Sequence, residues 1–415
     1  MDSKDLYFAL LGLKQPWTVE DVAMDVAKQE VVVTVVHPPK TRFCCPKCQR
    51  ELPLFDHATE RRWRHLDSCQ FMTFLQAKAP RIDCPDHGKL QVNLPWAEPG
   101  SRFTIMFETL AIEVLQAANV KRAAALLRLS WDEAWGVMRR AVERGLVAKA
   151  DTAPRVIGVD EKAIAKGHRY MTLVCDLEAA TVEYVGEERT QASLAAYYAG
   201  LAPAQRGAIE AVSMDMWEPY IKATTAAIPG ADDKIVFDRF HIMQTVLRAL
   251  DLVRRAENRD LRADGDTTLV KTKYLWLRSR ENLTADAADY FSELRSLNLK
   301  TARAWALKES LRDLWSFTRR GWALRYWKKW YFWATHSRLL PMIEAARTIN
   351  RHLHNVLTYF AHPITNAVAE GLNSKIGTVQ KRACGFRNRD HFKIAVYFHC
   401  GGLNLFPSAF TPGKV

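Results

Sequence analysis

Three acidic residues lie far apart in this 415-residue chain, and each stands in a segment that can place a carboxylate beside a metal ion. Asp160 ends the apolar run 155–160, and Asp215 ends a second run, 208–215. Glu370 lies in a helix-like stretch, 364–375. Carboxylate oxygens suit Mg²⁺ or Mn²⁺, and a pair of such ions can activate a water and stabilise the leaving oxygen of a phosphodiester. These three residues are therefore predicted to hold two catalytic ions.

The segment around Glu370 separates an apolar stripe from a polar face at helical spacing. The stripe consists of Ile364, Val368, Leu372, Ile376 and Val379, and the polar face of Asn366, Glu370, Asn373 and Gly377. Glu370 is thus free to point at a metal instead of the core. Glu161, Asp176 and Asp238 are competing acids. Asp176 could hydrogen-bond a metal-bound water, and Asp238 with His241 is expected to support the ligands or contact substrate.

The elements around these acids alternate between strands and helices after a break at Pro154. Strands are predicted at 155–160, 169–176, 181–186, 207–214 and 234–237, and helices at 190–201 and 217–227. This β-β-β-α-β-α-β order is the one that an RNase H-like core requires. Asp160 and Asp215 become neighbours if the first and fourth strands pair at the sheet centre. From 239 to about 360 the pattern is almost wholly helical.

Clustered cysteines near the N-terminus predict a structural zinc site. Cys45-Pro-Lys-Cys48 and Cys84-Pro-Asp-His87 each space two ligands by two residues, as a tight turn around one tetrahedral Zn²⁺ needs. A strand hairpin is expected to fill the long insert between them. Two alternatives in ligand register stay open, because Cys44 could replace Cys45, and His65 with Cys69 could supply other ligands.

Net charge and composition indicate a polyanionic partner. The chain carries a formal charge of +13 with a pI near 9.3, and each basic residue that neutralises a phosphate releases a counterion. Charge alone does not distinguish DNA from other polyanions. No apolar run approaches the ~18 residues of a membrane helix, and no signal peptide is recognisable. The expected location is cytoplasmic and nucleoid-associated, with reduced thiols.

Residues 119–145 predict a helix-turn-helix. The first helix would cover 119–127, and Ser130 with Glu133 forms a capping box that starts the second. An ordinary helical hairpin fits the pattern about as well, and the preceding cysteine module and the net charge favour DNA binding. Trp131, Trp135, Met138 and Val142 are expected in the core, whereas Arg139 and Arg140 are expected on the other side, facing DNA.

Two further segments are candidate phosphate-binding tracks. Residues 301–340 carry nine Lys or Arg, two acids and six Trp, most of which should be buried while the basic residues line a DNA groove. The DNA-binding candidates there are Arg319, Arg320, Arg325, Lys328 and Lys329. Arginine beside aromatic rings suits phosphate contact combined with base stacking. A second track follows Glu370 and includes Lys375, Lys381 and Arg382, with Arg387 and Arg389 beyond.

Taken together, ordered strings between residues 40 and 403 resemble one group of bacterial insertion-sequence transposases, the ISL-three family. They include CPKC, RRWRHLDSCQ, CPDHG, LPWAEPGSRFT, VIGVDEKAIAKGHRYMTLVCDLE, FDRFH and NAVAEGLNSKIGTVQKRACGFRN. The resemblance implies a zinc finger, a helix-turn-helix, and a DDE core of RNase H-like fold interrupted by a helical insertion. Position by position it places the catalytic triad at Asp160, Asp215 and Glu370. His87 departs from an all-cysteine zinc finger.

The resemblance divides the chain into five segments: a zinc module at 1–98, a helix-turn-helix at 99–150, the core at 151–244 and 361–415, and a helical insertion at 245–360. It implies DNA transposition, in which the enzyme binds the inverted ends of its element as a homodimer or larger assembly, frees a 3′-hydroxyl and joins it to target DNA. Two rival hypotheses remain. A non-catalytic DNA-binding regulator leaves the acidic triad unexplained, and an RNase H-like nuclease leaves the DNA-binding modules without a purpose.

Overall fold

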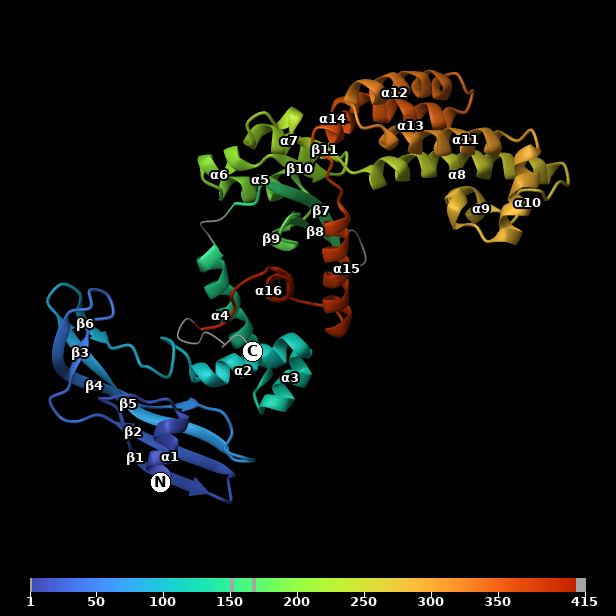
Figure 1. The fold of residues 1–415 in the computed structure, drawn as a ribbon. Helices are drawn as coiled ribbons and strands as arrows, with labels where there is room; N and C mark the ends of the chain where they lie inside the picture. Colours follow the sequence, from blue (N-terminus) through green and yellow to red (C-terminus); the bar gives the residue numbers. More distant parts are fainter. Residues whose placement is uncertain (1, 150–152, 166–168, 408–415) are drawn as a thin grey trace. The chain divides into compact units, whose positions relative to one another are not determined.

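A computed structural model describes residues 2–149, 153–165 and 169–407 of the chain (Figure 1). The chain divides into two compact units. The first contains residues 2–149 together with Asp390–His399 and the segment that begins at Leu403, and the second contains most of the residues between them. The sequence-based division assigned all of 361–415 to the core, whereas this division assigns most of the last helix to the N-terminal unit.

The first unit contains a six-stranded sheet preceded by a short helix, α1 (Ser3–Leu10). Its strands are β1 (Thr18–Asp25), β2 (Glu30–Val36), β3 (Arg42–Cys44), β4 (Glu51–Arg64), β5 (Met72–Cys84) and β6 (Gly88–Gln91). They run in the order β1-β2-β5-β4-β3, with β6 paired to β5. Val31, Val33 and Val35 of β2 alternate with less buried residues, as a strand with one covered face requires. The expected hairpin between the cysteine pairs is confirmed as β4 and β5.

The helices of this unit are α2 (Ile105–Ala117), α3 (Val120–Leu127), α4 (Trp131–Lys149) and residues 390–399 of α16 (Arg389–Cys400). The predicted turn is confirmed: Arg128 ends α3 in the left-handed region. Ser130 and Glu133 exchange side-chain and backbone hydrogen bonds at the start of α4. Trp135 is buried and stacks on His391 of α16 at 4.3 Å between ring centroids. The prediction for Trp131 was wrong, because this side chain is 47% exposed.

A five-stranded mixed sheet forms the centre of the second unit. It consists of β7 (Val156–Ala165), β8 (Arg169–Asp176), β9 (Thr181–Glu187), β10 (Ala211–Met214) and β11 (Ile235–Phe237), ordered β11-β10-β7-β8-β9. β7, β8 and β9 are antiparallel neighbours, and β10 runs parallel to both β7 and β11. α5 (Gln191–Ala199), α6 (Pro203–Ala208) and α7 (Glu218–Ala227) lie beside it (Figure 1). The predicted strands and helices are thus present, except that the strand expected at 207–214 begins only at Ala211, after the added helix α6. Every residue of β10 and β11 is buried, as in a parallel sheet covered on both faces.

A helical part follows β11 within the same unit (Figure 1). It comprises α8 (Arg239–Ala263), α9 (Lys273–Leu277), α10 (Ala285–Ser296), α11 (Lys300–Arg312), α12 (Arg320–Thr335), α13 (Leu340–Arg351) and α14 (Leu353–Leu357), before α15 (Ala367–Arg382). Ile242, Val246 and Val253 face the core from α8 at helical spacing. Four of the six Trp between 301 and 340 are buried, which confirms that expectation. Within the described ranges, no helix has the length and apolarity to cross a membrane.

Candidate active site and zinc centre

Strand register brings three aspartates to one end of the mixed sheet. In β10, Ser213 pairs with Gly158 of β7, and Met214 pairs with Phe237 of β11. Asp215 and Asp238 are the residues that follow β10 and β11, and Asp160 lies two residues beyond Gly158. Parallel strands that end together place the residues after them side by side. Asp160, Asp215 and Asp238 therefore line the same edge of the sheet.

The expectation that Asp160 ends its strand was wrong. β7 continues to Ala165 because β8 still pairs with it, and Asp160 stands opposite Leu173. What ends near Asp160 is the pairing of β7 with the short strand β10, whose last partner in β7 is Gly158. A carboxylate in the middle of a strand is held by two flanking peptides, so its backbone position is more rigid than a strand end would be.

Hydrogen bonds hold helix α15 against β7, and Glu370 of this helix therefore lies near the aspartates. Asn373 donates its amide to Asp160 Oδ2 at 2.6 Å, and its carbonyl accepts from Lys162 Nζ at 2.8 Å. Two turns later Gln380 donates to the carbonyl of Ile164 at 2.9 Å. Glu370 lies one turn before Asn373 on the same face. Burial together with the carboxylates of Asp238 and Asp160 raises the pKa of Glu370. The polar face predicted for this helix is the face that meets β7.

Arg189 is a residue of this site that the sequence pattern did not reveal. Its guanidinium lies 2.8 Å from Glu161 Oε2 and 3.7 Å from Asp215 Oδ2, over the ring of Trp217 at 4.2 Å. The Asp215 carboxylate also accepts from the backbone N–H of Met216 at 2.6 Å. Arg189 stands in the loop between β9 and α5, where no periodicity marks it, so only tertiary contacts could identify it. Its charge neutralises acids that would otherwise repel one another.

Arg189 and a divalent ion should compete for the same carboxylates. We expect Arg189→Ala to lower the dissociation constant for Mn²⁺ by about 5- to 10-fold, because a neighbouring positive charge no longer opposes the ion. Mn²⁺ titration followed by electron paramagnetic resonance measures this directly. Arg155→Ala, which removes an exposed arginine paired with exposed Glu210, is the matched control and should change nothing. Unchanged Mn²⁺ affinity in Arg189→Ala would show that the two cations do not compete.

Asp238 and His241 lie beside the triad, as the sequence-based hypothesis of a supporting role requires. Asp238 is 6% exposed and caps α8, with Oδ1 accepting from the N–H of Phe240 at 3.2 Å. Its Oδ2 has no hydrogen-bond partner among the described residues. His241 Nδ1 lies 4.0 Å from Asp215 Oδ2. Burial raises the pKa values of Asp160, Glu161 and Asp238. Without a bound cation, the negative charges of these carboxylates therefore lower the free energy of unfolding.

Asp238→Asn should therefore stabilise the metal-free protein at neutral pH. The raised pKa of Asp238 means that its charge destabilises the fold above that pKa, and the amide removes the charge while it keeps the cap. The gain should vanish as pH falls through this pKa, since wild-type Asp238 is then protonated as well. Thermal unfolding from pH 4 to 8 tests this, at ~2–4 °C for each kcal/mol gained. Exposed Asp232→Asn is the control, and equal melting shifts for both variants at pH 7 would refute the argument.

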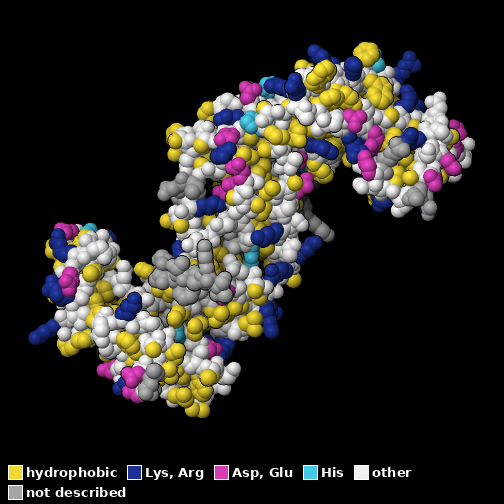
Figure 2. All heavy atoms as spheres, in the orientation of Figure 1, with side chains coloured by type: hydrophobic (Ala, Val, Ile, Leu, Met, Phe, Trp, Pro, Cys, Tyr) yellow, Lys and Arg dark blue, Asp and Glu magenta, His cyan; other side chains and the backbone are white. Residues whose placement is uncertain are grey.

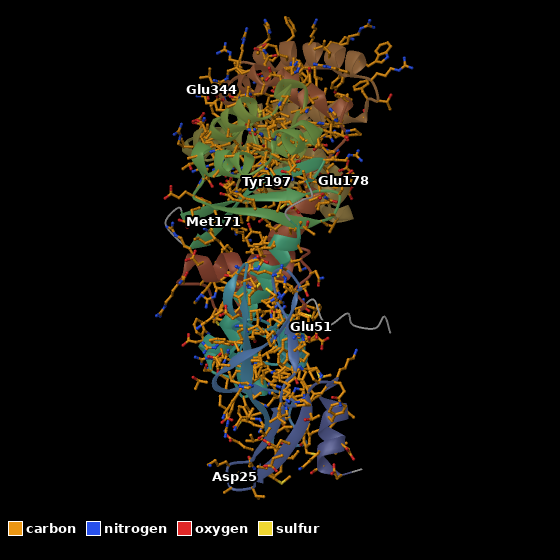
Figure 3. The ribbon with its side chains drawn as sticks, turned by 90° about the vertical axis from the view of Figure 1, so that its left-hand side faces the viewer. Asp25, Glu51, Met171, Glu178, Tyr197 and Glu344 are labelled. Carbon is orange, nitrogen blue, oxygen red and sulfur yellow. The ribbon has the colours of Figure 1, made fainter. Side chains whose placement is uncertain are left out.

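Asp176 does not reach the acids, contrary to one of the sequence-based alternatives. It pairs with Ile157, toward the start of β7, and Oδ1 accepts from the backbone N–H groups of Glu178 and Ala179 in the turn that follows β8. Met171, near the other end of β8, and Glu178 lie on opposite sides in Figure 3. Asp176 is therefore a turn residue. It lies at the opposite end of β8 from the sheet edge where Asp160 and Asp215 meet.

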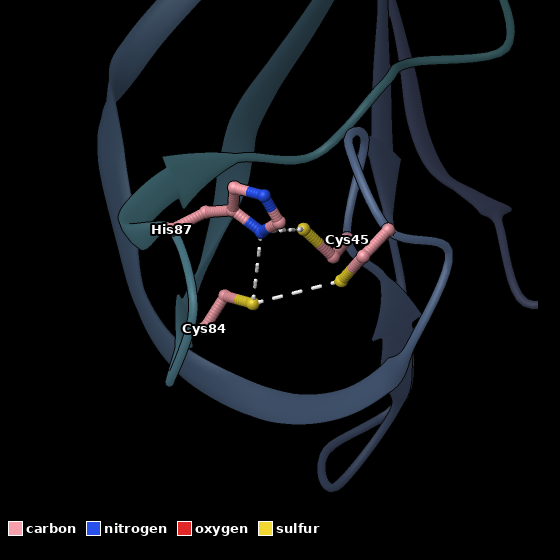
Figure 4. A group of neighbouring side chains, drawn as sticks. Cys45, Cys84 and His87 are labelled. Carbon is pink, nitrogen blue, oxygen red and sulfur yellow. Dashed lines mark hydrogen bonds between the residues drawn. The ribbon is translucent and has the colours of Figure 1, made fainter.

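The four zinc ligands predicted from spacing lie together in the first unit (Figure 4). The Sγ atoms of Cys45, Cys48 and Cys84 and the Nδ1 of His87 all lie within 4.8 Å of one another. Cys48 Sγ is 3.7 Å from Cys84 Sγ, and His87 Nδ1 is 3.5 Å from Cys84 Sγ. Sulfurs bound at ~2.3 Å to one tetrahedral zinc are about 3.8 Å apart, so these separations fit the ion. The backbone N–H of Cys48 lowers the pKa of Cys45 to about 6, which favours the thiolate that zinc binds.

The alternative ligand registers do not fit this geometry. Cys44 is exposed at the end of β3, whereas Cys45 is buried and is the member of this pair whose sulfur lies in the cluster. His65 is buried with Nδ1 2.9 Å from Thr104 Oγ1, and burial lowers its pKa to about 4. Cys69 is exposed in the β4–β5 loop.

The donor atoms of the acidic site are less tightly gathered than those of the zinc group. In the described part of the chain, only the zinc group brings three such donors within 4.8 Å of one another.

Three family models match successive parts of the chain. A family model described as transposase, for the DDE domain of family ISL3, matches residues 157–396, which is more than half of the chain. A helix-turn-helix domain of transposase family ISL3 matches residues 92–142, and a zinc finger of transposases IS204, IS1001, IS1096 and IS1165 matches residues 41–87. This chain belongs to the ISL3 family of transposases.

Individual relatives of this transposase agree along almost its whole length. The transposase for insertion sequence element IS1001 of Bordetella parapertussis is 28% identical over 391 residues, which cover 93% of this chain and 96% of the relative. The transposase for IS1557 of Mycobacterium tuberculosis (strain CDC 1551 / Oshkosh) is 26% identical over 419 residues, covering 92% of each. The same figures hold for the IS1557 transposase of strain H37Rv. The chain is thus a DNA-acting enzyme with a zinc-finger domain and a helix-turn-helix.

Two adjacent arginines of the helix-turn-helix, Arg139 and Arg140, were expected to face DNA. The structure places them in different surroundings. Arg139 is exposed on α4. Arg140 instead donates to Glu108 Oε2 at 2.9 Å and lies over the ring of Phe103. Glu108 is 2% exposed, and its buried charge is compensated by Arg140 together with Arg144, which lies 2.8 Å from Glu108 Oε1. Arg140 is therefore paired within the first unit whereas Arg139 is exposed, a difference that helical spacing alone could not reveal.

Aromatic and basic side chains share the exposed face of α12. Arg325, Lys328 and Lys329 are exposed, and the Arg325 guanidinium lies 4.8 Å from the ring of Trp322, which is 55% exposed. Dark blue and yellow side chains intermingle over this helix in Figure 2. Arg319 and Arg320 are also exposed, although Arg320 contacts His354 at 3.2 Å. On α15, exposed side chains include Lys375, Lys381 and Arg382.

Proposed function

We propose that this transposase binds the inverted-repeat ends of its own element, hydrolyses a phosphodiester to free a 3′-hydroxyl, and joins that hydroxyl to target DNA. The catalytic residues in this proposal are Asp160, Asp215 and Glu370. Their core is an RNase H-like fold, an assignment supported by three antiparallel strands followed by two parallel ones on the side of the first strand.

The observation that carries the proposal is the convergence of acids from three distant segments. Asp160 and Asp215 lie at one sheet edge by strand register, and the hydrogen bond from Asn373 to Asp160 brings the helix of Glu370 to the same place. Such a bond over a separation of 213 residues cannot arise from local structure. Burial raises the pKa of Asp160, which distinguishes this acid from a solvated surface carboxylate.

The donor set fits a hard divalent cation. Carboxylate oxygens at a partly buried edge are the ligands that Mg²⁺ and Mn²⁺ prefer, and two such ions supply Lewis-acid stabilisation of attacking and leaving oxygens when bound. The residues that would hold them are Asp160, Asp215 and Glu370, with Glu161 adjacent. Asn373 fixes the orientation of the Asp160 carboxylate, and Asp238 with His241 supports Asp215 from behind.

Exposed basic residues would guide double-stranded DNA to this site. Lys375, Lys381 and Arg382 continue the helix of Glu370, and Arg319, Arg320, Arg325, Lys328 and Lys329 lie in or next to α12. Arg139 would contribute from the helix-turn-helix. Because phosphate contacts release counterions, binding should weaken steeply with salt. We expect a homodimer or larger assembly on DNA and a cytoplasmic, nucleoid-associated location.

A strand-transfer assay tests the proposal and its rivals together. The substrate is a labelled duplex carrying the inverted repeat that flanks the gene, offered with target plasmid and Mg²⁺ or Mn²⁺. Cleavage at the repeat followed by joined products supports transposition. Cleavage without joining would favour an RNase H-like nuclease, and specific binding without cleavage would favour a regulator. A duplex of scrambled sequence is the control for end recognition.

A further inference from the structure

A cavity of about 410 Å³ opens beside the acids of the second unit. Asp238 and Glu370 are among its lining residues, and the first turns of α8 contribute Phe240, Met243 and Leu247. Leu277, at the end of α9, lines it as well. The volume lies in the range of pockets that enclose a small organic molecule, ~300–1,000 Å³. Phosphodiester chemistry at the acids alone does not require such a space.

The α8 wall presents apolar side chains to the cavity, and Phe240 is the most exposed of them. Phe240 is 55% exposed although it lies only two residues after buried Asp238. Met243 and Leu247 recur three and seven residues later, so the three side chains form one stripe along the helix. Ile242 and Val246 of α8 are buried in the core, and Met243 packs partly against the same core, so Phe240 is the member of the stripe that is left exposed. An aromatic ring left exposed beside catalytic carboxylates is suited to stack against a flat partner.

Three basic residues line the cavity beside this apolar wall. Arg239 is exposed, and its guanidinium lies 5.5 Å from the ring of Trp315 without an ion-pair partner among the described residues. Lys308 and Arg312 of α11 also line the cavity and pair with Glu309. Arg239 is therefore the cation left to meet a ligand. An apolar slot with a free arginine at its rim matches a ligand with a flat ring and an attached phosphate.

We propose that this cavity holds one unstacked nucleotide of the DNA strand next to the scissile phosphate, with its base against Phe240 and its phosphate at Arg239. The inference rests on the proposed function, because the scissile phosphate must lie at Glu370 for a neighbouring nucleotide to reach Phe240. A base inside an intact duplex cannot enter such a slot, so the nucleotide must leave the stack. Its extrusion would hold the DNA end in one register at the acids.

The test combines protein variants with abasic DNA. The full-length protein and Phe240→Ala, Phe240→Trp and Leu252→Ala are compared on a duplex carrying the flanking inverted repeat. Leu252 is an equally exposed apolar residue, at 52%, on the same helix outside the cavity. A single abasic site is then moved through the three positions on each side of the cut. Binding is measured by fluorescence anisotropy, and cleavage is measured under single-turnover conditions.

We expect Phe240→Ala to weaken binding of the intact duplex by about 5- to 150-fold, the range that base–aromatic stacking supplies. Phe240→Trp and Leu252→Ala should bind like wild type. An abasic site at one position should remove the difference between wild type and Phe240→Ala, and 2-aminopurine at that position should brighten on binding. The thermal unfolding of Phe240→Ala should equal that of wild type, since the ring is exposed.

Two negative results have different meanings. If wild type binds and cleaves the repeat while Phe240→Ala does so equally well, or if its defect persists at every abasic position, the nucleotide pocket is refuted and the proposed function stands. If wild type neither prefers nor cleaves the repeat, the proposed function is refuted, and the nucleotide pocket, which rests on it, is refuted as well.

Discussion

Replacing Asp160 or Asp215 by Asn, or Glu370 by Gln, should reduce DNA cleavage and strand transfer by on the order of 10³-fold or more while it leaves DNA binding nearly intact. The amide keeps the shape of each side chain but removes the charge that divalent cations need, and the stabilisation is lost where the transition state requires it. The measurement is single-turnover cleavage of the flanking inverted repeat, with binding followed by anisotropy on the same duplex.

Glu178→Gln is the matched control, because Glu178 is an exposed acid in the turn after β8 (Figure 3). It should cleave like wild type. Asn373→Ala should give an intermediate defect, since it frees the Asp160 carboxylate from its 2.6 Å hydrogen bond without removing charge. A triad variant that turns over near the wild-type rate in Mg²⁺ would exclude that residue from catalysis.

Loss of zinc should unfold the zinc-binding part of the first unit, and this is the second large effect that we expect. Cys48→Ser or Cys84→Ser should each abolish stoichiometric zinc, because a closed four-ligand site contributes its binding free energy to folding. For structural zinc that free energy is ~10–16 kcal/mol in small zinc fingers, far more than one packing contact supplies. The freshly purified protein should hold one zinc per chain by elemental analysis.

Cys44→Ser supplies a control that differs from Cys45→Ser by one position. Cys44 is exposed and Cys45 is buried within the cluster, so only the second variant should lose the metal. Chelation of wild type should make residues 40–95 sensitive to protease before the mixed sheet of the second unit. Equal zinc content in Cys45→Ser and Cys44→Ser would mean that the ligand register is wrong.

Much of this architecture could be predicted from the sequence, because the decisive signals are local. Two ligand pairs spaced by two residues indicated the zinc cluster, and the capping box Ser130–Glu133 indicated the start of α4. The strands and helices between 155 and 237 followed from apolar runs and breaks. The face that Glu370 shares with Asn373 followed from helical spacing.

Only the tertiary structure decided which residues meet. Strand pairing places Asp160 inside β7 and Asp238 beside Asp215. It also places Asp176 in the turn after β8, away from the other acids. Arg189, in a loop with no periodic pattern, forms an ion pair with Glu161. Arg140 forms an ion pair with buried Glu108, whereas adjacent Arg139 is exposed. Local patterns depend on neighbours within one or two helical turns, whereas ion pairs between distant segments depend on sheet register and packing. The sequence therefore determined the elements and their chemistry, and the fold determined the partners of each charged side chain.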